Sequence, residues 1–171
     1  MVLKIKDLKG SGVVDLSDIS FVKDEIKKIE RVQYFKLKVG DIVLAMSGNT
    51  TGKIGAIPNL EEELFLNQRV GKFFIDDEKY QIFIYLFLMS GNYEEKILSM
   101  GYGSAQPNIN PTQIENIDVI YSDNDTLENF INATTPIFTK KMDNLHQIQS
   151  LTRSRDELLP RLMKGELRVK F

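Results

Sequence analysis

Residues 101–110, GYGSAQPNIN, carry hydrogen-bonding side chains and no charge, although 27% of the chain is charged. Asn and Gln pair with the adenine edge through two hydrogen bonds, and Ser pairs with several bases, so Ser104, Gln106 and Asn108 are candidate base-contacting residues. The two glycines let the backbone approach a partner closely. A plain connection, whose asparagines satisfy local turns, is the alternative that the loop by itself favours.

Two segments resemble nucleotide-binding loops but lack the required spacing. SGNTTGKI, at 47–54, has three residues between its first glycine and the Gly-Lys pair where a phosphate-binding loop needs four, and Ile54 follows the lysine where Ser or Thr is needed. GYGSAQ begins like a dinucleotide-binding turn, but Gln106 stands where the third glycine belongs. These departures argue against an NTPase and against a dinucleotide-binding protein.

No set of residues with the spacing of a catalytic or metal centre is visible. The chain has no Cys, and its one histidine, His146, lies among Asn and Gln residues in a helical pattern. Ser47 and Lys53 have the chemistry of a nucleophile and a base, but their spacing is ordinary for a turn. We therefore expect no catalytic residues, no metal and no cofactor, and a small hydrolase is a remote alternative.

The formal net charge of −2 by itself argues against a nucleic-acid partner. Lys and Arg nevertheless exceed the acids in residues 1–60 and in residues 127–171, whereas the acids exceed them in residues 61–126. A basic front segment and a basic tail can share one face, and ordinary solvated surface explains the same distribution equally well.

Length and composition predict a chain of one domain, or of one domain and an appendage. The absence of Cys suits a reducing compartment. The N-terminus lacks a signal-peptide pattern, and the apolar run IFIYLFLM, at 82–89, is far shorter than the roughly 20 residues that a bilayer requires. We expect a cytoplasmic protein without a membrane partner.

The first half of the chain has the pattern of short strands. Apolar residues alternate or cluster in residues 2–8, 41–46, 52–58 and 69–75, with Gly, Asn and Pro between them. Residues 76–100 begin with acids and then become apolar almost all round, which predicts a buried helix. The sequence therefore predicts an α+β fold, with a small β-rich sheet or barrel around that helix.

Local signals refine this outline at three places. Ser90-Gly91 predicts a break in the buried helix. Asn110 followed by Pro111 predicts an N-cap with proline at the first helical position. Residues 117–122, IDVIYS, predict a further strand.

Residues 126–164 predict a long helix that projects from the domain. Apolar residues recur there in alternating steps of four and three, which is an interrupted heptad seam. At 1.5 Å per residue the helix would be roughly 58 Å long. Pro136 predicts a kink or a restart, Pro160 a disturbance close to the end, and Gly165 the stop.

Four segments, in this order, resemble the DNA specificity (S) subunit of type I restriction-modification systems. They are LKVGDIVLAMSGNTTGKIGAI, LNQRVGKF, GYGSAQPNINPTQIENIDV and RDELLPRLMKGELRV. The resemblance covers about residues 34–171. It implies a target recognition domain, which we place at residues 1–123, and a conserved spacer helix with its tail at residues 124–171.

The family pattern has this unit twice in one polypeptide, with the two helices packed antiparallel, whereas this sequence contains it once. A two-fold homodimer with a two-helix rod would restore the pattern, so we expect a half-subunit or a fragment that pairs with a second copy of itself. The resemblance further implies a non-catalytic subunit, which positions DNA adenine methyltransferase subunits and a restriction subunit on double-stranded DNA with a bipartite, palindromic target.

These expectations assign roles to particular residues. Phosphate contacts are expected from Lys36, Lys38, Lys53 and Arg69. Base contacts are expected from Asn49, Thr50, Ser104, Gln106 and Asn108. The dimer seam is expected to contain Leu127, Ile131, Phe138, Leu145, Ile148, Leu159 and Leu162, with Lys141, Thr152 and Arg155 setting the helix register.

A protein-binding adaptor is the main alternative function. It would be a small mixed domain whose helical arm dimerises or docks on another protein, and the net negative charge agrees with it. Binding to duplex DNA separates the two hypotheses.

Overall fold

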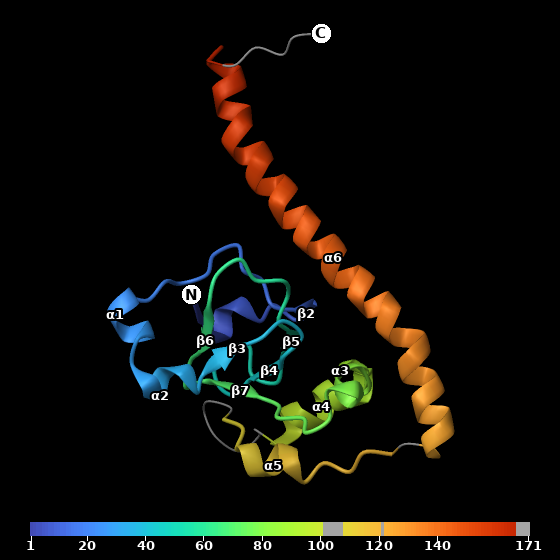
Figure 1. Ribbon diagram of the computed structural model, residues 1–171. Coiled ribbons are helices and arrows are strands. Elements are labelled where there is room, and N and C mark those ends of the chain that lie inside the picture. The colour runs from blue at the N-terminus through green and yellow to red at the C-terminus, as the bar shows by residue number, and fades with distance from the viewer. Residues whose placement is uncertain (101–107, 121, 167–171) are drawn as a thin grey trace.

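The computed structural model describes residues 1–100, 108–120 and 122–166. It shows a mixed domain of short strands and helices beside one long helix, α6 (Asn124–Met163), which runs past the domain (Figure 1). The α+β class that the sequence predicts is confirmed. The first half of α6 contributes to the domain's own core. The predicted boundary between residues 123 and 124 therefore marks the start of a helix, while the hydrophobic core continues across it.

The strands of the described residues form two small sheets. One has the order β1 (Val2–Leu3), β6 (Leu64–Leu66), β3 (Lys36–Leu37), and the other has the order β2 (Gly12–Val13), β5 (Ile54–Ala56), β4 (Ile42–Ala45), β7 (Val70–Lys72). β1 with β6 and β2 with β5 are parallel pairs, and the other neighbours are antiparallel.

The strands predicted at 41–46, 52–58 and 69–75 contain β4, β5 and β7. The alternating pattern of residues 2–8 yields only the two residues of β1, followed by a short 3-10 helix, η1 (Ile5–Asp7). The Asp7 carboxylate accepts the backbone N–H of Lys4 at 2.8 Å, which turns the chain away from an extended path.

The helices before α6 are short. They are α1 (Asp24–Lys27), α2 (Glu30–Gln33), the 3-10 helix η2 (Glu78–Tyr80), α3 (Gln81–Met89), α4 (Gly91–Met100) and α5 (Pro111–Glu115). The predicted break between α3 and α4 is confirmed, because Ser90 is extended. The predicted cap of α5 is also confirmed, because the Asn110 side chain accepts the N–H of Thr112 at 3.0 Å.

The strand predicted at 117–122 is wrong. Residues 117–120 have no regular structure, and residue 121 lies outside the described residues. Ile117 is buried but Ile120 is 88% exposed, so only one end of this apolar segment reaches the core, and no described strand pairs with it.

Two apolar clusters form the core. One lies around β1, β3 and β6 and includes Leu3, Leu37 and Leu64. The other lies between the four-stranded sheet, α3 and α6, and at its centre the Tyr85 hydroxyl donates to the carbonyl oxygen of Gly12 at 2.9 Å. The Phe138 ring of α6 packs on Tyr85 with 4.9 Å between ring centroids, so burial on α3 holds the first half of α6 in place.

α6 is uninterrupted over 40 residues, so the helix neither restarts at Pro136 nor breaks at Pro160. Its axis bends within the first half of the helix (Figure 1). Pro136 has no backbone N–H to donate. Just before it, the Thr134 hydroxyl donates to the carbonyl of Phe130 and the Thr135 hydroxyl donates to the carbonyl of Ile131. The predicted stop is confirmed, since Gly165 has φ 72° and donates to Leu162.

Candidate nucleic-acid interface

Three chain segments meet at the end of β4 through the backbone of Met46. Its N–H donates to the carbonyl oxygen of Arg69 at 3.0 Å, and its carbonyl accepts the N–H of Ile109 at 2.9 Å. Ser47 and Asn108 form an antiparallel bridge next to it. The turn after β4, the turn between β6 and β7 and the segment around Asn108 therefore lie together at one end of the four-stranded sheet.

The turn between β4 and β5 is held by its own backbone and by η1. Gly48 and Gly52 both have φ 85°, and a Cβ at Gly48 would lie 2.7 Å from the Ile5 side chain, so glycine is required there. The Thr50 hydroxyl donates to the carbonyl oxygen of Ile5 at 2.7 Å. The turn presents Asn49, which is exposed, while part of the hydrogen-bonding capacity of Thr50 is used within the protein.

The turn between β6 and β7 exposes the positively charged side chain of Arg69. The Asn67 side chain accepts the backbone N–H of Arg69 at 3.2 Å, and the Asn67 carbonyl accepts the N–H of Val70 at 2.9 Å. Gln68 and Arg69 are exposed. Among the residues that the structure describes, no carboxylate pairs with the Arg69 guanidinium. This side chain is therefore available for a phosphate group.

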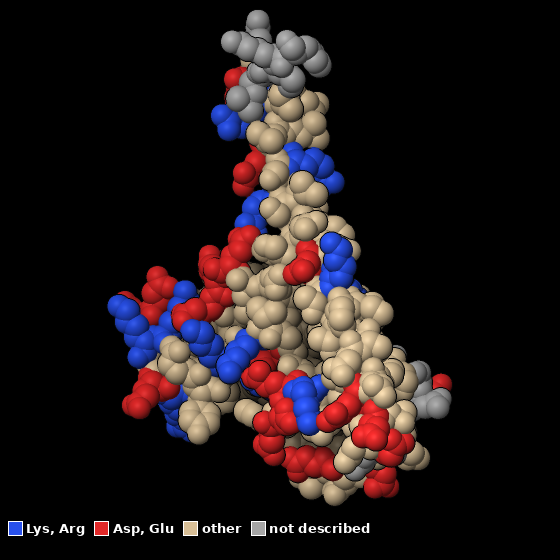
Figure 2. Space-filling view, turned by 45° about the vertical axis from the view of Figure 1, so that its right-hand side comes forward, with Lys and Arg blue, Asp and Glu red and all other residues tan. Residues whose placement is uncertain are grey.

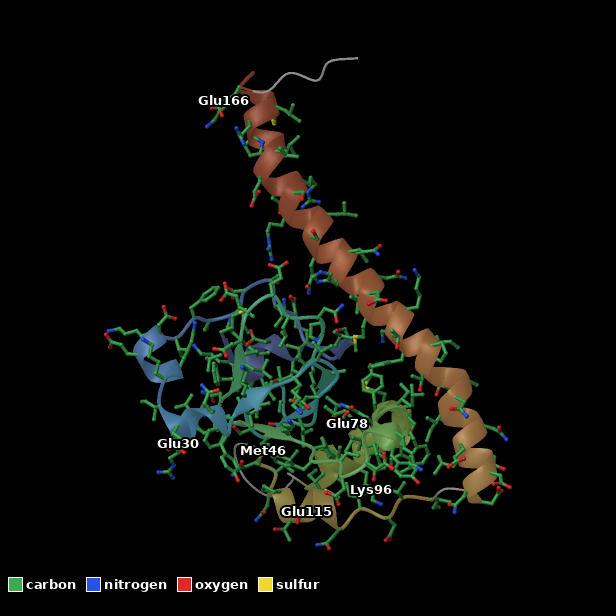
Figure 3. The ribbon with its side chains drawn as sticks, in the orientation of Figure 1. Glu30, Met46, Glu78, Lys96, Glu115 and Glu166 are labelled. Carbon is green, nitrogen blue, oxygen red and sulfur yellow. The ribbon has the colours of Figure 1, made fainter. Side chains whose placement is uncertain are left out.

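The register of β3 on β6 brings an exposed tyrosine to the same end. Leu66 donates to the carbonyl oxygen of Phe35 at 2.8 Å, so Tyr34 lies beside the turn that starts at Asn67. Tyr34 is 87% exposed. Figure 3 likewise places Met46 and Glu30, the first residue of α2, on one side of the domain. Sequence reasoning missed Tyr34, because the pairing that places it joins residues far apart in the chain, and it missed Gln68, although this residue stands next to the predicted Arg69 in the same turn.

The three predicted lysines do not share this position. The ammonium of Lys36 lies 2.5 Å from the Glu63 carboxylate and lowers the pKa of Glu63. The Lys36 side chain is therefore directed away from the turns. Lys38 belongs to the turn before β4, at the opposite end of the sheet. Lys53 follows the turn that contains Asn49 and is half-buried, with its ammonium 3.4 Å from the Lys9 carbonyl.

The structure thus brings together Asn49, Thr50, Arg69 and Asn108 of the predicted contacts, with Lys53 beside them. Lys36 and Lys38 lie apart from this group. Ser104 and Gln106 lie outside the described residues.

Acidic side chains gather near the start of α6 and the start of α3, in the lower part of Figure 2. Those that lie in these segments and are exposed are Asp76, Asp77, Glu78, Asp123, Asp125 and Glu128. Lys79 bridges two of them, at 3.6 Å from Asp77 and 3.5 Å from Glu128. The negative potential there repels phosphate, so the end of β4 is the better candidate for a nucleic-acid interface.

The residues predicted for the dimer seam divide into two groups. Leu127 and Ile131 are each 7% exposed, and Phe138 and Leu145 pack against the same core cluster. These four side chains have partners within their own chain. Ile148, Leu159 and Leu162 remain exposed, as do Leu151 and Leu158, which the seam prediction omitted.

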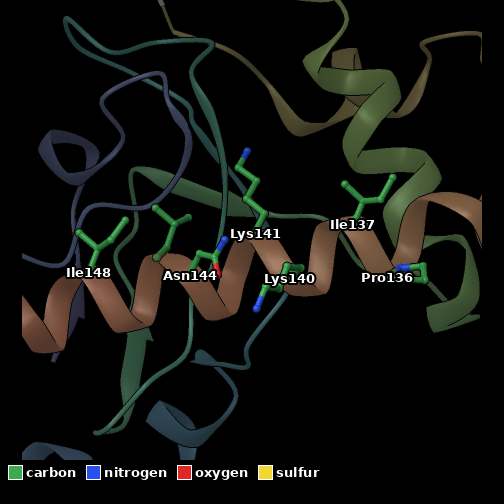
Figure 4. Close-up of a pocket in the computed structure, with 7 residues that line it drawn as sticks. Pro136, Ile137, Lys140, Lys141, Asn144 and Ile148 are labelled. Atoms are coloured by element: carbon green, nitrogen blue, oxygen red, sulfur yellow. The ribbon is translucent and has the colours of Figure 1, made fainter.

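A shallow apolar hollow lies on the exposed side of α6 (Figure 4). It is lined by Pro136, Ile137, Lys140, Lys141, Asn144, Leu145 and Ile148. The ammonium of Lys141 turns toward the domain and lies 3.5 Å from the Tyr85 hydroxyl.

The described residues contain no group of three or more His, Asp or Glu side chains that is arranged to hold a metal ion. None of the helices built from those residues is both long and apolar enough to cross a bilayer.

Comparison with known proteins places these features in a family. The sequence pattern of the family described as "Type I restriction modification DNA specificity domain" matches residues 2–146. The MjaVIII specificity subunit of a type I restriction enzyme from Methanocaldococcus jannaschii is 27% identical over 177 residues, which cover 98% of this chain and 40% of the relative.

Two further relatives carry similar names. The HindI specificity subunit of a type I restriction enzyme from Haemophilus influenzae is 30% identical over 116 residues, covering 67% of this chain and 25% of the relative. The MjaIX specificity subunit from Methanocaldococcus jannaschii is 39% identical over 67 residues, covering 39% of this chain and 16% of the relative. The chain therefore spans well under half the length of the specificity subunits that it matches.

Proposed function

Because the chain belongs to the family of type I restriction-modification DNA specificity domains, we propose that it recognises one half of a divided target on double-stranded DNA. In this role it works in the cytoplasm and positions DNA adenine methyltransferase subunits, and in the full system a restriction subunit, at that target. Methylation and cleavage belong to those subunits, so this chain supplies recognition and geometry.

The observation that carries the proposal is the junction at Met46. Two backbone hydrogen bonds bring the turn with Asn49, the turn with Arg69 and the segment with Asn108 to one end of a small sheet. Exposed amides read base edges, and an Arg that pairs with no described carboxylate binds phosphate, so this end combines the two kinds of contact that specific recognition needs.

The exposed part of α6 supports a homodimer. Leu151 is 69% exposed and Ile148 58%, and α6 beyond them projects past the domain (Figure 1). A lone projecting helix gains little from tertiary packing, and helices of this kind are marginal in water. Pairing of two such helices through a two-fold axis covers the apolar residues and places a recognition domain toward each end of the rod.

A titration tests the proposed function. The full chain, alone and together with its modification subunit, is added to fluorescent duplexes of mixed sequence, and polarisation is followed at several salt concentrations. We expect binding that weakens with salt and that prefers the duplex carrying the motif methylated in the host genome. If the complex binds that duplex no better than a scrambled one, the chain is an adaptor and the proposal is wrong.

A further inference from the structure

Two different stripes of side chains run along α6. The first packs against the chain's own domain and contains Leu127, Ile131, Phe138, Met142 and Leu145. The second faces solvent, and its members recur in steps of four and three without interruption: Ile137, Lys141, Asn144, Ile148, Leu151, Arg155, Leu158 and Leu162. All eight are exposed. This second set, the outer stripe, has the heptad spacing of a two-stranded coiled coil.

We propose that a second copy of the chain covers the outer stripe in one antiparallel register, with the two-fold axis between Gln149 and Ser150. The proposal rests on the homodimer of the proposed function and adds its register. The pairs across the interface are Ile137 with Leu162, Lys141 with Leu158, Asn144 with Arg155, and Ile148 with Leu151.

Polar residues select this register. Asn144 and Arg155 are two of the three polar positions in the outer stripe, and here they face each other, so the Asn carbonyl accepts from a guanidinium N–H. Arg155 already bonds to Asp156 at 2.8 Å and keeps further N–H groups for Asn144. A shift by one heptad in either direction sets Asn144 against Ile148 or Leu162. It also leaves two seam positions at each end unpaired, which costs buried hydrogen bonds and apolar contact.

Lys141 is compatible with its place opposite Leu158. Its ammonium points back to the domain, 5.9 Å from the centre of the Tyr85 ring, so only the aliphatic stem faces the partner helix. At the flank of the seam, Lys140 approaches Arg161 of the second copy. Glu166 lies 3.9 Å from Arg161 and offsets this repulsion.

The register fixes the distance between the two recognition domains. The apolar core of each domain packs on α6 between Leu127 and Leu145, whose midpoint is Pro136, and an exposed ion pair between Glu61 and Arg153 lies beyond it. From there to the axis is about 20 Å at 1.5 Å per residue, so the domains lie about 40 Å apart. That distance corresponds to about 12 base pairs, which is one turn of the duplex and about one and a half base pairs more, so the two domains meet faces of the DNA about 50° apart.

Disulfide trapping tests the register, because the chain has no natural Cys. Full-length Ile137→Cys is mixed with full-length Leu162→Cys and oxidised, and covalent dimers are resolved on non-reducing gels. We expect efficient trapping of this pair and little trapping of Ile148→Cys with Leu158→Cys, which meet only after a shift of one heptad. Ser150→Cys, exposed but outside both stripes, is the matched control and should remain monomeric on the gel.

A second pair of variants tests the polar layer itself. In a background carrying Asn144→Leu and Arg155→Leu, we expect trapping of the shifted pair at 148 and 158 to rise severalfold, because apolar seams tolerate several registers. Trapping that is unchanged in this background overturns the assigned role of Asn144 and Arg155.

Sedimentation separates the failure of the register from the failure of the dimer. A dimer that traps only the shifted pair, or no pair at all, overturns the register and leaves the proposed homodimer standing. A chain that sediments as a monomer, alone and with its modification subunit, overturns both.

Discussion

The backbone N–H of Ile109 donates to the carbonyl oxygen of Met46 at 2.9 Å, so the chain on both sides of Ile109 is fixed against the end of β4. Two asparagines flank this bond and have different surroundings. Asn108 is exposed beside the turn that presents Asn49, whereas the Asn110 side chain caps α5 by accepting the N–H of Thr112 at 3.0 Å. In the proposed function Asn108 contacts a DNA base, whereas Asn110 stabilises the start of α5.

Asn108→Ala should therefore change base preference and leave stability unaltered. We expect discrimination at one base pair to fall by about 1–3 kcal/mol, since a bidentate amide contact is lost. Asn110→Ala is the matched control, because it should lower the free energy of unfolding by about 1 kcal/mol and leave base preference intact. Competition titrations with single-base variants of the target, together with urea unfolding, measure both. Equal loss of affinity for every duplex would contradict the role of Asn108.

Arg69→Ala should weaken binding to all DNA sequences alike. The Arg69 guanidinium has no carboxylate partner among the described residues and lies at the same end as Asn108, so we assign it to a phosphate group. Loss of one phosphate contact lowers the slope of log K against log salt by about one. The matched control is Lys38→Ala, at the opposite end of the sheet, for which the slope should not change. If Lys38→Ala lowers the slope as well, the interface extends beyond the end of β4.

Local signals in the sequence predicted the elements that form the site. The buried run of residues 41–46 became β4, and Asn110 with Pro111 became the start of α5, because turn and cap residues determine such features within a few positions. Tyr34 could not be found in this way. Its place beside the Asn67 turn depends on the bond between Leu66 and Phe35, which are far apart in the sequence.

The seam of α6 illustrates the same limit. Phe138 and Leu145 are as apolar as Ile148 and Leu151, so spacing alone merged two stripes into one. Only the packing of α3 shows that the first two side chains belong to the core of their own chain. The polar residues that the sequence placed in the seam, Lys141 and Arg155, do lie on the outer stripe, but Thr152 does not.

The pH dependence of stability should include a contribution from Asp15. Its carboxylate lies 2.5 Å from the Lys9 ammonium and accepts the N–H of Ser17 at 2.8 Å, which lowers its pKa from 3.8 to about 2. Because the folded state depresses this pKa, the stabilisation is present above about pH 4 and is lost as the pH falls toward 2.

Asp15→Asn should remove this contribution. We expect a loss of at most about 1 kcal/mol at pH 7, since the pair is largely solvated and screened, and no difference from the parent near pH 2. Urea unfolding at both pH values measures it. Glu62→Gln, which removes one carboxylate from an exposed position without a described ion pair, is the control and should leave the free energy of unfolding unchanged. If the free energy of unfolding of Asp15→Asn is still below that of the parent at pH 2, the side chain acts through packing.

Lengthening α6 at the two-fold axis should change the target. Seven residues are inserted between Gln149 and Ser150, with Leu at the two positions that continue the outer stripe. The insertion keeps Asn144 opposite Arg155 and adds two apolar layers related by the two-fold axis. The insertion displaces Arg153 from Glu61, but that ion pair is exposed and contributes little. The domains move apart by about 10 Å, or about three base pairs, because each residue adds 1.5 Å along the helix.

The recognised gap should therefore grow by about three base pairs, and the parental target should be lost. Three base pairs also rotate the duplex by roughly 100°, so affinity at the new gap should stay below that of the parent at its own gap. The methylated motifs of a host that expresses the variant give the gap directly. The same seven residues placed after Lys164, beyond the paired part of the helix, should leave the motif unchanged. An unchanged motif with the central insertion would show that α6 does not set the spacing of the half-sites.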